Sequence, residues 1–170
     1  MAEALDPALP PALDTLTKQV LAEACARGLM LVTAESCTGG LLASLLTDIP
    51  GSSHAFERGF VTYTDEAKHE LLGVPMDVLE RDGAVSEPAA RAMAQGALAR
   101  SHGHIAVSVT GFAEGGPGEE PGLVHFASAR TGRTTLHREH HFGDIGRAAV
   151  RLRCLEVALQ MMLERLNSAD

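Results

Sequence analysis

A serine, a tyrosine and a lysine in the first half of this chain have residue types and positions suited to hydrolytic chemistry. Ser36 follows an apolar run, Leu29–Val32. Tyr63 closes a second short apolar run, and Lys68 falls in the first turns of the helix predicted after it. A serine hydroxyl is a poor nucleophile until a neighbour removes its proton, which a buried lysine or a tyrosine poised by a cation can do. The three residues predict a serine/lysine hydrolase, although such residues near helix starts are also common as caps.

The turn that follows Ser36 has the composition of an anion-binding loop. Thr38, Gly39 and Gly40 precede a helical pattern that begins at Leu41. Backbone N–H groups at a helix start bind an oxyanion or a phosphate, and glycines let the ligand approach them closely. We therefore expect these three residues to contact the substrate.

Cys37, beside the serine, is a second candidate nucleophile. A thiol at a helix start has a lowered pKa, which increases its reactivity. The alternative is that Cys37 is a small buried residue that packs the turn. The sequence leaves both interpretations open.

Hydrophobic spacing predicts alternating helices and strands along the chain. The helices are expected at 13–27, 41–49, 64–73, 78–79, 86–101 and 148–166, and the strands at 29–32, 60–63, 104–110, 123–129 and 134–142. This order predicts an α/β fold, a three-layer α/β/α sandwich on a mixed central sheet of about five strands. A single domain over 14–170 should follow a flexible N-terminal segment, 1–13.

Composition narrows the possible partners. The 170 residues carry 14 Lys plus Arg and 22 Asp plus Glu, which gives a formal charge of -8. An acidic protein repels a phosphate backbone on average, so nucleic acid is not an expected partner. No apolar stretch reaches the roughly 18 residues that span a bilayer, so no membrane association is expected.

Cysteine and histidine spacing argues against a disulfide or a metal site. The three cysteines are odd in number, far apart in sequence and without CxxC spacing: Cys25, Cys37 and Cys154. This pattern suits reduced thiols in the cytoplasm. His137, His140 and His141 invite a zinc interpretation, but adjacent residues of a strand point to opposite faces. We expect no metal and no cofactor.

A succession of motifs resembles the CinA C-terminal domain family. Their order and spacing match the family from about Thr15 to Gly111, and the match is looser through the last helix. The motifs are Thr33–Gly40, Thr47–Ser53, Gly59–Tyr63, Glu66–Lys68, Leu72–Val74, Gly83–Glu87 and Val109–Gly111.

The resemblance implies a function and a set of catalytic residues. Characterised members are nicotinamide mononucleotide deamidases, serine/lysine amidohydrolases that convert nicotinamide mononucleotide and water to nicotinate mononucleotide and ammonia. The resemblance assigns the nucleophile to Ser36 and its activation to Lys68 and Tyr63. It implies a small-molecule nucleotide substrate, no metal and a homo-oligomer, a dimer or larger.

Further positions are expected to bind this substrate. Glu35 would balance the charge of the pyridinium ring or hold the loop, and the 5′-phosphate would dock on amides and hydroxyls. The full set of expected substrate-binding residues is Glu35, Thr38, Gly39, Gly40, Thr110, Gly111 and Arg147.

The chain departs from the family pattern in the loop 111–122. This loop lacks the usual lysine and carries three glutamates, and carboxylates repel phosphate. A non-catalytic or differently specific nucleotide-binding module is therefore the alternative function. A role in competence or DNA repair, suggested by the family's historical name, is disfavoured by the acidic charge.

Overall fold

The structure is a computed structural model that describes residues 10–168. Of the predicted flexible segment 1–13, residues 1–9 lie outside the described residues, and Pro11 to Leu13 already belong to the first helix. The helices are α1 (Pro11–Arg27), α2 (Leu41–Thr47), η1 (Ser52–His54), α3 (Asp65–Leu72), α4 (Met76–Asp82), α5 (Glu87–Ala99) and α6 (Arg147–Asn167). The strands are β1 (Leu31–Glu35), β2 (Phe56–Val61), β3 (Ile105–Gly111), β4 (Leu123–Arg130) and β5 (Leu136–His141).

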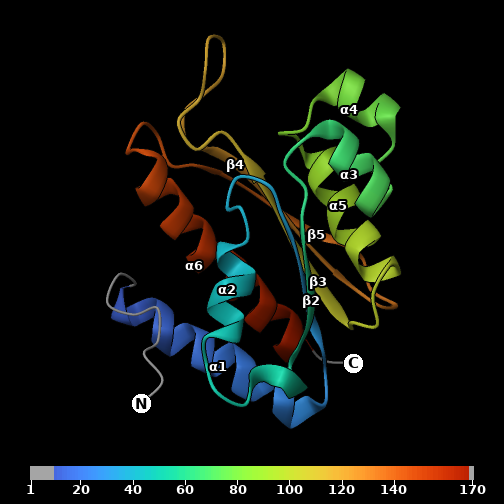
Figure 1. Cartoon of the computed structure of the whole chain (residues 1–170), viewed down its shortest axis with the longest axis vertical. Helices are drawn as coiled ribbons and strands as arrows, with labels where there is room; N and C mark the ends of the chain where they lie inside the picture. Colours follow the sequence, from blue (N-terminus) through green and yellow to red (C-terminus); the bar gives the residue numbers. More distant parts are fainter. Residues whose placement is uncertain (1–9, 169–170) are drawn as a thin grey trace.

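The five strands form one mixed sheet in the order β2-β1-β3-β4-β5. β1 is parallel to β2 and to β3, whereas β3, β4 and β5 are successively antiparallel. Helices α1, α2 and α6 cover one face of the sheet, and α3, α4 and α5 cover the other (Figure 1). The predicted three-layer α/β/α sandwich is confirmed.

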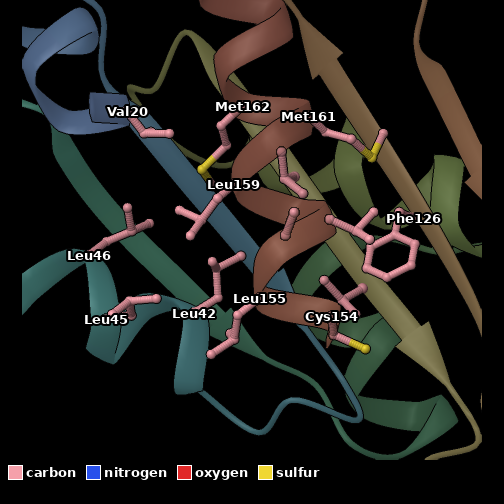
Figure 2. Close-up of a cluster of buried hydrophobic side chains, with 14 of the residues drawn as sticks. Val20, Leu42, Leu45, Leu46, Phe126, Cys154, Leu155, Leu159, Met161 and Met162 are labelled. Atoms are coloured by element: carbon pink, nitrogen blue, oxygen red, sulfur yellow. The ribbon is translucent and has the colours of Figure 1, made fainter. Parts of the chain in front are cut away.

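The core is divided between the two faces of the sheet. On the face of α1, α2 and α6, leucines of α2 and α6 pack with Met161, Met162 and Phe126 (Figure 2). On the other face, alanines of α5 bring that helix close to the sheet, where Ala90 and Ala94 pack against Ala127 and Ala129. Burial of these apolar side chains is the main term that stabilises the fold.

Two strands differ in position from the sequence prediction. β1 begins two residues later than expected and continues through Thr33 and Glu35, which are fully buried. β2 begins at Phe56 rather than Phe60, because backbone pairing with β1, not hydrophobicity, defines this half-buried edge strand. The extension of β1 past Val32 and the early start of β2 were missed because polar side chains interrupt the apolar signal on which the prediction rested.

Hydroxyl side chains cap the two helices that border the site. Thr64 caps α3, accepting a hydrogen bond from the N–H of Ala67 at 3.1 Å, and Ser86 caps α5, accepting one from Ala89 at 3.3 Å. α3 ends at Gly73, whose φ of 67° lies in the left-handed region that glycine adopts readily. The start and end of the helix that carries Lys68 are therefore both determined locally.

Candidate active site

The carboxyl ends of the three parallel strands meet at one edge of the sheet. Ser36 directly follows β1, Tyr63 follows β2, and Thr110 and Gly111 end β3. In open parallel sheets, ligands bind at this edge, beside the point where the connections change from one side of the sheet to the other. A cavity of about 340 Å³ lies here, a volume in the range of small-molecule sites.

Ser36 and Lys68 are in hydrogen-bond contact inside this cavity. Nζ of Lys68 lies 3.1 Å from Oγ of Ser36, and both residues line the cavity. Nζ also donates to the carbonyl of Thr62 at 3.1 Å and reaches that of Tyr63 at 3.5 Å. These two carbonyls account for two N–H groups, so a neutral amine has its lone pair left for the serine proton.

The burial of Lys68 shifts its titration toward the neutral form. The side chain is only 1% exposed, and this burial lowers the pKa of the amine, since a charged ammonium loses its hydration there. The nearby Asp65 and Cys37 oppose this by raising the pKa. A lysine in this state is a suitable acceptor for the proton of Ser36.

Glu35 holds the loop that carries Ser36 rather than lining the cavity. Its buried carboxylate accepts hydrogen bonds from the N–H groups of Gly40, Leu42 and Ala43 at 2.9 to 3.1 Å. A carboxylate is favoured at a helix start, where the dipole and free amides are positive. Of the two roles expected for Glu35, the structure shows the second, holding the loop.

The backbone groups of the turn Thr38–Gly40 are also hydrogen-bonded within the protein. The N–H of Gly39 donates to the carbonyl of Ser36 at 3.0 Å, and the N–H of Gly40 is bound by Glu35. The carbonyl of Thr38 accepts from Arg151 at 3.0 Å, and the hydroxyl of Thr38 is buried without a partner among the described residues. The cavity is therefore not lined by the three residues expected to bind an anion, Thr38, Gly39 and Gly40.

Tyr63 and Arg147 stand at the mouth of the cavity. The guanidinium of Arg147 lies near the phenol of Tyr63 and 3.5 Å from a carboxylate oxygen of Glu114. These contacts raise the pKa of the Arg147 guanidinium. Tyr63 is 65% exposed, and its carbonyl rather than its phenol approaches Lys68. A direct part for the phenol in proton transfer stays a prediction.

The end of β3 and the loop after it form the remaining wall. The Thr110 hydroxyl donates to the carbonyl of Ala84 at 2.8 Å, which fixes the turn before α5 against β3. A side chain at Gly111 would clash, since a Cβ there would lie 2.6 Å from Val124. Among the ten expected site residues, six line the cavity: Ser36, Tyr63, Lys68, Thr110, Gly111 and Arg147.

Sequence reasoning missed part of this wall. Ala84, Val85 and the loop from Phe112 to Gly116 also line the cavity, as does Glu119. The loop extends beyond the sheet edge between β3 and β4 (Figure 1). Gly83 and Ser86 were interpreted only as helix boundaries. The loop after β3 has no periodicity, so the sequence did not indicate that it lies along the cavity.

The histidines of the β4–β5 hairpin lie apart from this cavity. Nδ1 of His125 is 3.0 Å from Nε2 of His137, and burial lowers the pKa of both imidazoles. His140 stacks on Phe142, whereas His141 is more exposed. Over residues 10–168, no group of three or more His, Cys, Asp or Glu side chains is placed to hold a metal ion.

Comparison with known proteins identifies the family to which this fold belongs. A family model described as the CinA C-terminal domain matches residues 13–166, so the chain belongs to the CinA C-terminal domain family. The crystal structure of the competence/damage inducible protein CihA from Agrobacterium tumefaciens has a TM-score of 0.91 and 44% identity, covering 96% of this chain and all of that one.

Curated relatives divide into two kinds by length. The nicotinamide-nucleotide amidohydrolase PncC of Escherichia coli strain K12 is 47% identical over 154 residues, which cover 88% of this chain and 92% of that protein. The CinA-like proteins of Akkermansia muciniphila and Syntrophus aciditrophicus are 52% and 46% identical, but the matched region spans only 31% and 37% of their length. Within the described residues, no helix is long and apolar enough to cross a membrane.

Proposed function

We propose that this chain is a nicotinamide mononucleotide amidohydrolase that uses a serine nucleophile and a lysine base. The observation that carries the proposal is the 3.1 Å contact between Nζ of Lys68 and Oγ of Ser36 inside a cavity of suitable size. The likeness to PncC over nearly its whole length supports the substrate.

The proposed reaction proceeds in two halves. Oγ of Ser36 attacks the carboxamide carbon while its proton passes to Nζ of Lys68, and the resulting ammonium gives that proton to the amide nitrogen, which leaves as ammonia when the C–N bond breaks. Water next attacks the acyl carbon and loses a proton to Nζ of Lys68. The bond from that carbon to Oγ then breaks, Lys68 returns the proton to Oγ of Ser36, and nicotinate mononucleotide leaves. The cationic pyridinium ring makes the carboxamide carbon more electrophilic, so an activated serine is sufficient without a metal.

The phosphate is proposed to meet Arg147 at the mouth of the cavity. A guanidinium binds phosphate oxygens in pairs, and the phosphate would replace the exposed contact that Arg147 makes with Glu114. Thr110 and Gly111 form the adjoining wall. Glu114 and Glu119 lie near this position, so the acidic loop should weaken phosphate binding unless Arg147 outweighs it.

Ammonia release from nicotinamide mononucleotide tests the proposal. Ser36→Ala should lower turnover by about 10³-fold or more because the attacking atom is removed. Cys37→Ala is the matched control in the neighbouring position and should retain turnover. Loss in Cys37→Ala together with retention in Ser36→Ala would assign the nucleophile to the thiol instead.

The alternative is a nucleotide-binding module of the same fold without this activity. The observation in its favour is the acidic loop, in which Glu114 already pairs with Arg147. Calorimetry with nicotinamide mononucleotide distinguishes the two functions, since tight binding without ammonia release supports the alternative. A cytoplasmic location and a homo-oligomer belong to the proposal as predictions.

A further inference from the structure

Two cysteines that are distant in sequence meet behind the nucleophile. Cys37 directly follows Ser36, and Cys154 lies on α6 within the core, where Figure 2 shows it near Phe126 and Leu155. The two thiols belong to one buried cluster, and each is the neighbour that most changes the pKa of the other. All three cysteines of the chain are free thiols.

α6 holds the loop beside this pair. One turn before Cys154, the guanidinium of Arg151 donates to the carbonyl of Thr38 at 3.0 Å. The same guanidinium lies 3.4 Å from the position that a Cβ on Gly39 would take. The loop is thus fixed against the face of α6 that presents Cys154, so the two thiols are held together by the fold.

The two thiols differ in access and reactivity. Cys37 is 6% exposed and lines the cavity, whereas Cys154 is fully buried. The neighbouring Cys154 lowers the pKa of Cys37, with help from the charge of Arg151, while Cys37 and burial raise the pKa of Cys154. A small oxidant that enters the cavity therefore meets the more reactive thiol first.

We propose that Cys37 and Cys154 form a reversible disulfide when a peroxide enters the cavity, and that this disulfide switches the active site off. The sulfur of Cys37 attacks a peroxide oxygen, the O–O bond breaks, and hydroxide leaves, so that Cys37 becomes a sulfenic acid. The sulfur of Cys154 then attacks that of Cys37, water leaves with the thiol proton, and the S–S bond forms. The peroxide is reduced as the two thiols are oxidised.

The expected loss of activity follows from the position of Ser36. A disulfide brings two sulfurs to about 2.05 Å, much closer than two free thiols approach, and so draws Cys37 toward α6. Ser36 precedes Cys37 and must move with it, away from Nζ of Lys68. Because a displacement of about 1 Å in a catalytic group can cost on the order of 10²-fold, we expect turnover to fall at least about tenfold. This inhibition rests on the proposed function, whereas disulfide formation does not.

Hydrogen peroxide treatment of a Cys25→Ser protein tests the proposal, because this variant lacks the exposed third thiol. The expected result is the loss of two hydrogen atoms from the intact mass and a Cys37–Cys154 peptide in the digest. Turnover of nicotinamide mononucleotide should fall at least about tenfold and return with dithiothreitol. The Cys25→Ser/Cys154→Ala protein is the control and should keep its basal turnover, gaining oxygen on Cys37 in place of the mass loss.

The mass measurement and the activity measurement have separate outcomes. A protein that keeps both thiols free at peroxide concentrations that oxidise Cys25 in the unmodified chain overturns the disulfide. A disulfide that forms while turnover is unchanged overturns the switch. If untreated protein shows no turnover at all, the proposed function fails, and the mass still decides whether the two thiols pair.

Discussion

At the scale of single residues, the proposed mechanism depends on the environment of one lysine. The chain contains only two lysines, Lys18 and Lys68. Lys18 is exposed and pairs with Asp14 at 2.6 Å, where a charged amine is well solvated. Lys68 has no carboxylate within ion-pair distance among the described residues, and its amine faces Ser36 and two carbonyls. Its environment, not its residue type, lowers its pKa and makes it the proposed base.

We predict that turnover falls as the pH is lowered through the pKa of Lys68. Burial lowers this pKa from its ordinary value of 10.5, and only the neutral amine accepts the serine proton, so activity is present above the pKa and lost below it. The pH profile of kcat/KM measures this acid limb.

Lys68→Met and Lys18→Met are a matched pair for this prediction. Lys68→Met should lower kcat by about 10²–10⁴-fold, the usual contribution of a general base, and remove the acid limb. Lys18→Met should leave both unchanged. An acid limb that survives in Lys68→Met would show that another group titrates and would exclude Lys68 as the base.

At the scale of elements, the position of Lys68 depends on how closely α3 approaches α5. Gly96 of α5 faces the end of α3, and a Cβ there would lie 1.8 Å from the carbonyl oxygen of Leu72. The contact is with backbone, which cannot rotate away. Lys68 lies one turn earlier on α3, so any shift of this helix moves the amine relative to Ser36.

We predict that Gly96→Ala destabilises the protein and lowers turnover. Helix propensity alone would favour alanine by about 1 kcal/mol, whereas overpacking costs about 1–3 kcal/mol, and a clash with backbone lies at the upper end of that range. The net loss in the free energy of unfolding should be about 1–2 kcal/mol, measured in urea. Ala99 is exposed in the same helix. Ala99→Gly should lower the free energy of unfolding by no more than about 1 kcal/mol and leave turnover intact. A more stable Gly96→Ala protein would contradict the close approach.

At the scale of the whole molecule, charge and topology determine what reaches the site. Acidic residues outnumber Lys plus Arg by 22 to 14, so the average surface repels polyanions. The cavity instead offers the guanidinium of Arg147 at its mouth, at the edge where three strands end. This arrangement suits a small substrate with a single phosphate better than an extended backbone.

We predict no binding of duplex DNA at physiological salt, in spite of the competence-related names of several relatives. Fluorescence anisotropy of labelled DNA should stay constant up to a protein concentration of about 10⁻⁴ M, the weak end of ordinary non-specific binding. A repeat near 0.01 M salt, where the Debye length is about 30 Å, is the most sensitive condition. Binding that weakens steeply with added salt would reveal a basic surface that the net charge conceals.

The sequence by itself was enough to predict the layers and to name the residues of the candidate site. Apolar periodicity predicted the helices on both faces, and capping residues such as Thr64 and Ser86 fixed where α3 and α5 begin. These signals are local, because a cap or a glycine acts within one turn of its own position. The types of Ser36 and Lys68 likewise predicted a serine/lysine pair before any distance was known.

Only the tertiary structure decided which groups meet. It brought Lys68 within 3.1 Å of Ser36, directed the carboxylate of Glu35 to α2, and placed Cys37 and Cys154 in one buried cluster. These contacts join positions on different elements, and no local propensity specifies the packing that sets their distance. The same packing removes Lys68 from water, and that desolvation turns an ordinary lysine into the base that the proposed reaction needs.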